Sequence, residues 1–338
     1  MNRIYPRYFF LGLLLCLAVS CSREDSNVGE EIGDIVATLP LRFADDVAVA
    51  GDYAFVTMDS LGVAVVDIHD PRSPVVLDTL QTHHESRELF VHGHRLYVAD
   101  FRGGITVFDI SDPGSPTELA NYPSAGDHTN DIFVTDNHIF EAGGQGSNGL
   151  LTIRDLSGSI LGTYTNAEGD EIYRGFACVW VDGDRAYAGT NGGWLHIIDV
   201  SNPSVPVKLG EYYNPGITGY DVWVLDVLVS GTRAYLADWG GGFIVLDVSD
   251  PANPQELGVF KDAPDGPDFY DVALDGSVAY TANGWGCLAV IDVSDPTNMS
   301  LILSVNPRGS SYHGIALYGS YAIIADNGAK QMAIIRVK

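Results

Sequence analysis

Three histidines stand in short polar segments beside acidic residues: His84 next to Glu85, His128 near Asp131, and His313. Imidazole and carboxylate groups bind divalent metals, and a histidine that titrates near neutral pH can act as a general acid or base. The HExxH motif and paired cysteines, which have diagnostic metal-binding spacing, are absent from the sequence. We therefore predict no cofactor, with a divalent metal on His84, His128 and His313 as one hypothesis. Histidines that only solvate or shape their loops are the alternative.

Other catalytic signals are weak. The sequence contains no GxSxG motif, and many of its serines lie in Ser-Asp-Pro turns. The glycines at 240–242 lie between two predicted strands rather than before a helix, so they do not form a phosphate-binding loop. We predict no catalytic residue and favour a non-enzymatic protein, with Cys178 as the one cysteine worth testing for reactivity.

The same segments carry large aromatic and hydrogen-bonding side chains. Flat rings beside Asp, Asn and Tyr suit a sugar or peptide ligand, whereas Trp, Tyr and Arg also anchor protein partners. The candidate ligand-binding residues are Arg87, His128, Asp131, Tyr173, Arg174, Tyr220, Trp239, Tyr270, Asp271, Trp285 and His313.

An internal repeat must position these residues. The phrase GGITVFDISDPGSP at 103–116 returns as GGFIVLDVSDPANP at 241–254. Its hydrophobic core recurs as VAVVD, ITVFD, LTIRD, LHIID, FIVLD, LAVID and MAIIR. A period of about 42–48 residues is typical of an array fold. A residue shared by most repeats, such as the Asp that ends this pentapeptide, is expected to serve the fold, and a residue unique to one repeat is a better functional candidate.

Each repeat predicts four short strands separated by turn signals, as in residues 222–260. The strands are almost continuously apolar, which is typical of strands buried on both faces. Seven four-stranded antiparallel units of this kind predict an all-β, seven-bladed β-propeller over residues 34–338, and a parallel solenoid is the alternative considered. Because the strands alternate in direction, the candidate loops should emerge together on one face of the ring.

The ends of the repeat region predict how the ring closes. The last repeat stops at MAIIRVK, in its third strand, and therefore lacks a fourth. Residues 34–41, DIVATLPL, resemble the fourth strands of other repeats. We expect them to pair into the last blade, which would remove an exposed sheet edge.

The LVIVD-like third strand, the Asp-Pro-x-x-Pro loop and the AYVAD-like second strand together resemble the LVIVD-repeat family of bacterial and archaeal cell-surface propellers. The resemblance covers residues 34–338, although the third repeat, RDLSGSILGTY at 154–164, lacks the Asp-Pro loop. It implies a propeller at the cell surface. It implies no common reaction and no catalytic residue.

The N-terminal segment predicts export. Arg3 and Arg7 precede an apolar run at 8–19 that is too short to span a bilayer, so we interpret residues 1–20 as a signal peptide. Small Ser20 before Cys21 resembles a lipoprotein cleavage site, which predicts lipidation of Cys21 and an acidic tether over 21–33. Ordinary signal cleavage is the alternative. The expected location is the periplasm or the outer-membrane surface.

The net charge of the chain limits the classes of binding partner that we expect. The chain has 44 acidic and 18 basic Lys and Arg residues, a net charge of −26 at pH 7. Nucleic acid is excluded as an expected partner because its binding depends on Lys and Arg neutralising phosphates. The sequence thus predicts a lipid-anchored binding or scaffolding module for an envelope protein, peptide or glycan, contacting the membrane only through the anchor. A metal-dependent or carbohydrate-active enzyme that uses the axial rim is the alternative.

Overall fold

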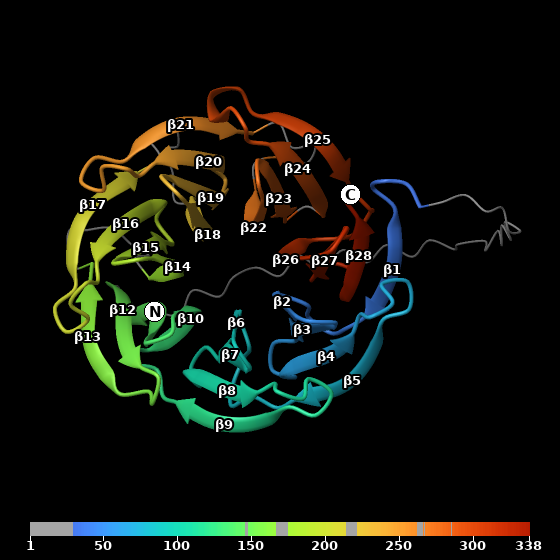
Figure 1. Cartoon of the computed structure of the whole chain (residues 1–338), viewed down its shortest axis with the longest axis horizontal. Helices are drawn as coiled ribbons and strands as arrows, with labels where there is room; N and C mark the ends of the chain where they lie inside the picture. The colour runs from blue at the N-terminus through green and yellow to red at the C-terminus, as the bar shows by residue number, and fades with distance from the viewer. Residues whose placement is uncertain are drawn as a thin grey trace, which may run out of the picture. The chain divides into compact units, whose positions relative to one another are not determined.

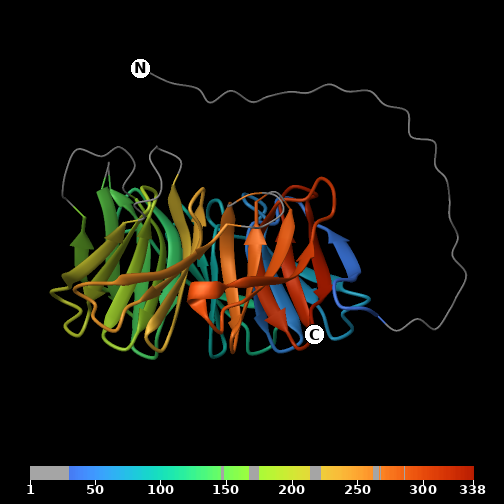
Figure 2. The same cartoon turned by 90° about the horizontal axis from the view of Figure 1, so that it is seen from above.

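Seven sheets of four antiparallel strands surround a central axis in the described part of the chain (Figure 1). This computed structural model describes residues 30–145, 148–166, 175–213, 222–261, 266, 268–284 and 286–338. Seen from the side, the strands run between the two faces of the ring (Figure 2). The prediction of a seven-bladed β-propeller with four-stranded blades is confirmed.

The blades follow one another along the chain, and the first strand of each lies nearest the axis (Figure 1). Blades one to three contain β2 (Val47–Ala50), β3 (Tyr53–Thr57), β4 (Val63–Asp67), β5 (Val75–Leu80); β6 (Leu89–His92), β7 (Arg95–Ala99), β8 (Ile105–Asp109), β9 (Thr117–Tyr122); and β10 (His128–Val134), β11 (His138–Gln145), β12 (Asn148–Asp155), β13 (Ile160–Thr165). Blades four and five contain β14 (Phe176–Asp182), β15 (Arg185–Thr190), β16 (Trp194–Asp199), β17 (Val207–Tyr213); and β18 (Trp223–Ser230), β19 (Arg233–Trp239), β20 (Gly242–Asp247), β21 (Gln255–Phe260). Blades six and seven contain β22 (Phe269–Asp275), β23 (Val278–Asn283), β24 (Cys287–Asp292), β25 (Ser300–Val305); and β26 (Tyr312–Tyr318), β27 (Tyr321–Asp326), β28 (Gln331–Arg336), β1 (Ile35–Pro40). A short 3₁₀ helix, η1 (Pro296–Asn298), precedes β25, and no helix among the described residues is long and apolar enough to cross a membrane.

The hydrophobic core lies between neighbouring sheets. Val56 and Val66 of blade one pack with Ile323 and Ile334 of blade seven, and all four are fully buried. Burying one such side chain contributes about 1.5–3 kcal/mol. The second and third strands are covered on both faces, which explains why their sequences are nearly continuous hydrophobic runs.

Strand β1 closes the ring. It pairs antiparallel with β28, with Thr38 opposite Ala333 and Leu39 opposite Met332. The prediction that residues 34–41 complete the last blade is therefore confirmed. Blade seven takes strands from both ends of the repeat region, so the edge of β28 is covered.

The aspartate that ends the third strand shapes the turn after it. In six blades one carboxylate oxygen of this residue accepts the N–H of the residue two positions later, at 2.8–2.9 Å, as expected for a structural role: Asp67, Asp109, Asp155, Asp199, Asp247 and Asp292.

Candidate functional site: an axial cavity with a carboxylate ring

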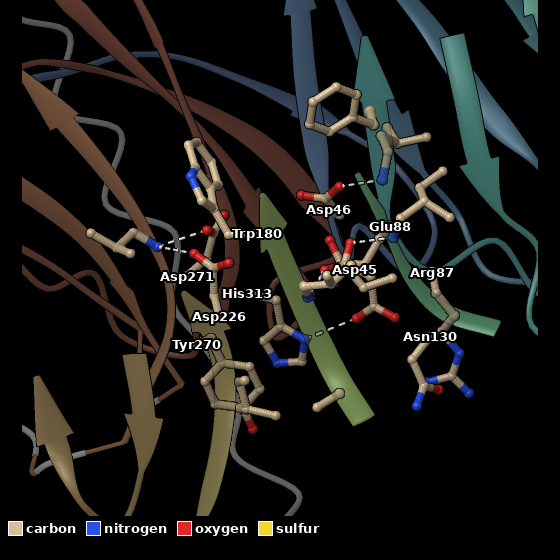
Figure 3. A pocket seen from close by; sticks show the side chains of 18 of the residues that line it. Asp45, Asp46, Arg87, Glu88, Asn130, Trp180, Asp226, Tyr270, Asp271 and His313 are labelled. Atoms are coloured by element: carbon tan, nitrogen blue, oxygen red, sulfur yellow. Dashed lines mark hydrogen bonds and ion pairs between the residues drawn. The ribbon is translucent and has the colours of Figure 1, made fainter. Parts of the chain in front are cut away.

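The first strands of all seven blades converge at the axis (Figure 1). A cavity of about 510 Å³ is lined by residues from all seven blades. Residues in or just before β2, β6, β10, β14, β18, β22 and β26 form most of its wall, and Asn191, between β15 and β16, adds to it. Figure 3 shows acidic, aromatic and histidine side chains gathered around it. Its volume falls within the range of about 300–1,000 Å³ that is typical of small-molecule sites.

A β-bulge directs side chains to the cavity in five of the first strands. In each, the pairing with the second strand skips one residue: Asn130, Ala177, Leu225, Tyr270 and His313. All five skipped residues line the cavity. A bulge leaves its extra residue unpaired and re-aims its side chain. This shared irregularity therefore gives the wall five side chains that differ from blade to blade.

The first strands also carry a recurrent acid, which follows the bulge in blades three, five and six (Asp131, Asp226 and Asp271) and lies just before β2 and β6 in blades one and two (Asp46 and Glu88). These five carboxyl groups line the cavity. Asp131 accepts the N–H of Ile132 and, from the next blade, the N–H of Val179, both at 2.6 Å. Asp46, Asp226 and Asp271 likewise accept a backbone N–H of the following blade, at 2.7–3.1 Å. We call these five residues the carboxylate ring, and it joins neighbouring blades at the axis.

The carboxylate ring holds protons more tightly than ordinary carboxylates do. Burial raises the pKa of Asp46 to about 6 and also raises the pKa of Asp226. Burial, together with neighbouring carboxylates, raises the pKa values of Glu88, Asp131 and Asp271 well above their usual range. Two hydrogen bonds join carboxyl groups within the ring, Glu88 to Asp46 and Asp271 to Asp226, and such a bond requires one protonated partner, which donates, and an acceptor oxygen on the other.

Blades four and seven lack the acid. Cys178 takes its position in blade four, where its thiol donates to the carbonyl oxygen of Val224 at 3.5 Å. Burial raises the pKa of Cys178 well above its usual value, so the thiol stays protonated. Gly314 takes the position in blade seven, where a Cβ would lie 2.7 Å from the Cα of Asp46. Glycine thus allows blades seven and one to approach closely at the axis.

His313 is held in one orientation at the cavity wall. Its Nδ1 lies 2.8 Å from Oδ1 of Asp45, and its ring stacks on Tyr270 with centroids 4.4 Å apart (Figure 3). Asn327 donates to the same oxygen of Asp45 at 2.5 Å. Burial alone would raise the pKa of Asp45, but the bonds from His313 and Asn327 lower it, so this carboxylate is ionised at neutral pH.

Ser311 extends this chain, because its Oγ lies 3.1 Å from Nε2 of His313. A serine, a histidine and an aspartate in this order resemble a nucleophile with its base and orienting acid. The hydroxyl of Ser311, however, donates to the carbonyl oxygen of Gly284 at 2.5 Å, and Ser311 is not among the cavity-lining residues. The serine is therefore not positioned to give its proton to His313.

The other two predicted metal ligands surround Phe101. The ring centroids of His84 and His128 lie 6.0 and 5.1 Å from that of Phe101, and the Arg87 guanidinium lies 4.8 Å from it. Burial is the main cause that lowers the pKa of His128. Among the described residues, no group of three His, Cys, Asp or Glu side chains could hold a metal.

Aromatic rings form the apolar part of the wall. Phe90, Phe133 and Trp180 all line the cavity. The ring centroid of Phe133 lies 4.7 Å from that of Phe90 and 5.0 Å from that of Trp180. Trp223 lines it as well and packs against Trp239, with ring centroids 4.7 Å apart. The predicted Trp239 thus lies next to the cavity, and its strand partner Trp223 reaches the wall.

The structure brings five of the predicted ligand-binding residues together in the wall: Arg87, Asp131, Tyr270, Asp271 and His313. His128 packs against Phe101, and Trp239 packs against Trp223 of the wall. Tyr173, Arg174, Tyr220, Trp285 and the predicted lipidation site Cys21 lie outside the described residues.

Sequence reasoning missed several wall residues, including Asp45, Asp46, Glu88, Asn130, Asn191, Trp180 and Trp223. One signal could have found part of this set. The residue just before each recurrent acid varies between repeats, and these positions supply Asp45, Arg87, Asn130, Leu225 and Tyr270.

Comparisons with known proteins agree with this architecture. The family model described as "LVIVD repeat" matches residues 42–82, 85–123, 175–214, 223–262, 268–307 and 310–335. The third repeat, which lacks the Asp-Pro loop, is not matched. No curated protein matches the chain. Among solved structures, the computationally designed Ika8 protein is similar, with a TM-score of 0.62, 11% identity, and coverage of 90% of this chain and 100% of that chain. At this identity the similarity concerns the fold alone. The repeat matches show that the chain belongs to the LVIVD-repeat family.

Proposed function

We propose that the protein is a non-catalytic binding module of the cell envelope that receives its ligand in the axial cavity. The observation that carries this proposal is the bulge position of the first strands. There the repeats stop resembling one another, and the differing side chains line one cavity of about 510 Å³. The fold needs a first strand in every blade, but it does not need a different side chain at this position in each blade.

A bulky residue in the cavity tests the proposal. Ala177 lines the wall from a bulge, so Ala177→Trp should fill space that the ligand needs. Val207→Trp is the matched control because Val207 is 53% exposed on the outer strand β17. The melting temperature of each variant is measured with envelope proteins, peptides and glycans. We expect Val207→Trp to respond to a ligand as the unmodified protein does, and Ala177→Trp to lose the response. Equal responses in both variants would place binding elsewhere.

Export and lipid anchoring complete the proposal. The supporting observations are the short apolar run at 8–19, the small residue before Cys21, and the acidic segment that follows. Mass spectrometry of the N-terminal peptide from the bacterial envelope should show a lipid-modified Cys21, and Cys21→Ala should release the protein from membranes. An unmodified N-terminus would favour ordinary signal cleavage.

The enzymatic alternative draws on the chain of hydrogen bonds from Ser311 through His313 to Asp45. It predicts covalent labelling of Ser311 by a fluorophosphonate probe. The metal form of this alternative predicts that chelation lowers the melting temperature and that one divalent metal restores it. We expect neither effect.

A further inference from the structure

We propose that the ligand of the axial cavity is a carbohydrate, with a sugar ring against the aromatic wall and its hydroxyl groups hydrogen-bonded to the carboxylate ring and to Trp223. This inference rests on the proposed function, because it names the ligand class for the same cavity.

The hydrogen-bonding groups of the carboxylate ring are only partly used. A carboxyl group offers about four acceptor positions. Asp131 accepts one backbone N–H on each oxygen. Asp271 accepts the N–H groups of Val272 and Ile315 in the same way and also forms a side-chain hydrogen bond with Asp226. The remaining acceptor positions belong to groups that line the cavity. A ligand with several hydroxyl donors suits such a wall.

The wall also supplies donors. The indole nitrogen of Trp223, one of the cavity-lining residues, is buried and has no hydrogen-bond partner among the described residues. Leaving a buried donor unpaired costs about 1–3 kcal/mol, so an acceptor on a ligand would relieve this cost. Glu88 and Asp271 form hydrogen bonds with Asp46 and Asp226 inside the ring, whereas Asp131, whose pKa burial raises, forms no such bond and adds a donor when it is protonated. A hydroxyl group both donates and accepts, and therefore matches this mixture.

The aromatic rings suit the apolar face of a sugar. Trp180, Trp223, Phe133 and Tyr270 line the same cavity as the carboxylate ring. Flat aromatic rings beside polar groups offer a surface for the C–H face of a pyranose while its hydroxyl groups reach the polar side.

A cationic amine or a lysine-containing peptide is the competing ligand class. An ammonium group only donates hydrogen bonds, so it would bind best after the protonated ring members lose their protons. Amine binding should then release protons, whereas binding of a neutral sugar should leave the protonation of the ring nearly unchanged.

A glycan array of neutral oligosaccharides, probed with the purified protein, selects the sugar for measurement. Its affinity is then determined by calorimetry in two buffers that differ in ionisation enthalpy. Trp223→Phe removes the indole N–H and keeps an aromatic ring. Trp194→Phe is the matched control. Trp194 lies in the neighbouring blade four, its ring centroid is 4.6 Å from that of Tyr213, and it does not line the cavity. We expect binding without proton release, about tenfold weaker in Trp223→Phe and unchanged in Trp194→Phe, provided that both variants keep the melting temperature of the unmodified protein.

The outcomes separate the two proposals. If no array sugar binds but spermidine or a lysine peptide does, with proton release and with loss in Ala177→Trp, the carbohydrate inference is wrong and the binding function stands. If sugar binding persists unchanged in both Trp223→Phe and Ala177→Trp, the sugar lies outside the cavity and the inference is also wrong. If none of these ligands binds, both proposals fail.

Discussion

Raising the pH from 5 to 8 should destabilise the folded protein through the carboxylate ring. In the folded state burial raises the pKa of these groups, so the folded protein binds more protons than the unfolded chain in this range. The free energy of unfolding falls with rising pH wherever the folded state holds the extra protons. The stabilising contribution is fully present below the unfolded pKa and is lost as the pH passes the folded pKa.

Asp46 gives the magnitude of this loss of stability. Its pKa rises from an ordinary value of 3.8 to about 6. Each unit corresponds to about 1.4 kcal/mol, so this residue alone accounts for about 3 kcal/mol that is lost between roughly pH 4 and pH 7. Glu88, Asp131 and Asp271 act in the same direction and extend the loss to higher pH.

The exposed turn aspartates change the free energy of unfolding in the opposite direction and over a different pH range. Hydrogen bonds from Ser111 lower the pKa of Asp109, and those from Ser201 lower the pKa of Asp199. Their contribution is present above the unfolded pKa and is lost as the pH falls below it. They therefore act at more acidic pH and do not mask the effect of the carboxylate ring.

Urea unfolding at pH 5, 6, 7 and 8, followed by tryptophan fluorescence, measures the effect. The series is repeated in about 0.5 M salt, because salt screens repulsion among surface charges much more than interactions of buried groups. We expect a fall of several kcal/mol that persists in salt. A free energy of unfolding that stays constant or rises from pH 5 to 8 would show that the carboxylate ring does not hold extra protons in the folded state.

Three further predictions concern single positions. Gly314→Ala should cost about 1–3 kcal/mol, because its Cβ would lie 2.7 Å from the Cα of Asp46 at the closing seam; an unchanged melting temperature would contradict the packing described there. Ile334→Ala should cost about 2–5 kcal/mol by opening a cavity between blades seven and one, and a urea-unfolding loss under 1 kcal/mol would count against that core. Cys178 should resist iodoacetamide at pH 8 in the native state and react after unfolding, since burial raises its pKa; rapid native modification, detected by mass spectrometry, would show that the thiol is accessible.

The repeat made the fold predictable. The pentapeptides recur along the chain, and most repeats add an Asp-Pro turn. Seven consistent copies outweigh the ambiguity of any one strand. The last repeat contains only three strands, and a blade that lacks a strand leaves an open edge, so the pairing of Thr38 and Leu39 with that blade could be predicted.

The cavity was only partly predictable. The recurrent acids of the first strand were visible as a pattern, but the sequence does not show that a bulge turns the preceding residue toward the axis. Asn130 therefore escaped notice, and Asp45 was missed because it lies just before a first strand that begins only at Val47. The distances between histidines depend on how seven blades pack, which explains why His84 and His128 share Phe101 while His313 pairs with Asp45. Trp223 was missed because its strand partner Trp239 stands beside the more conspicuous glycines.

A crystal structure of the protein with the tightest-binding array oligosaccharide would show directly whether the axial cavity binds carbohydrate. We expect electron density for the ligand inside the cavity, with a sugar ring against Trp223 and hydroxyl groups within hydrogen-bond distance of the carboxylate ring. Ligand density found only outside the cavity, on the outer strands or the Asp-Pro turns, would show that the cavity is not the carbohydrate site.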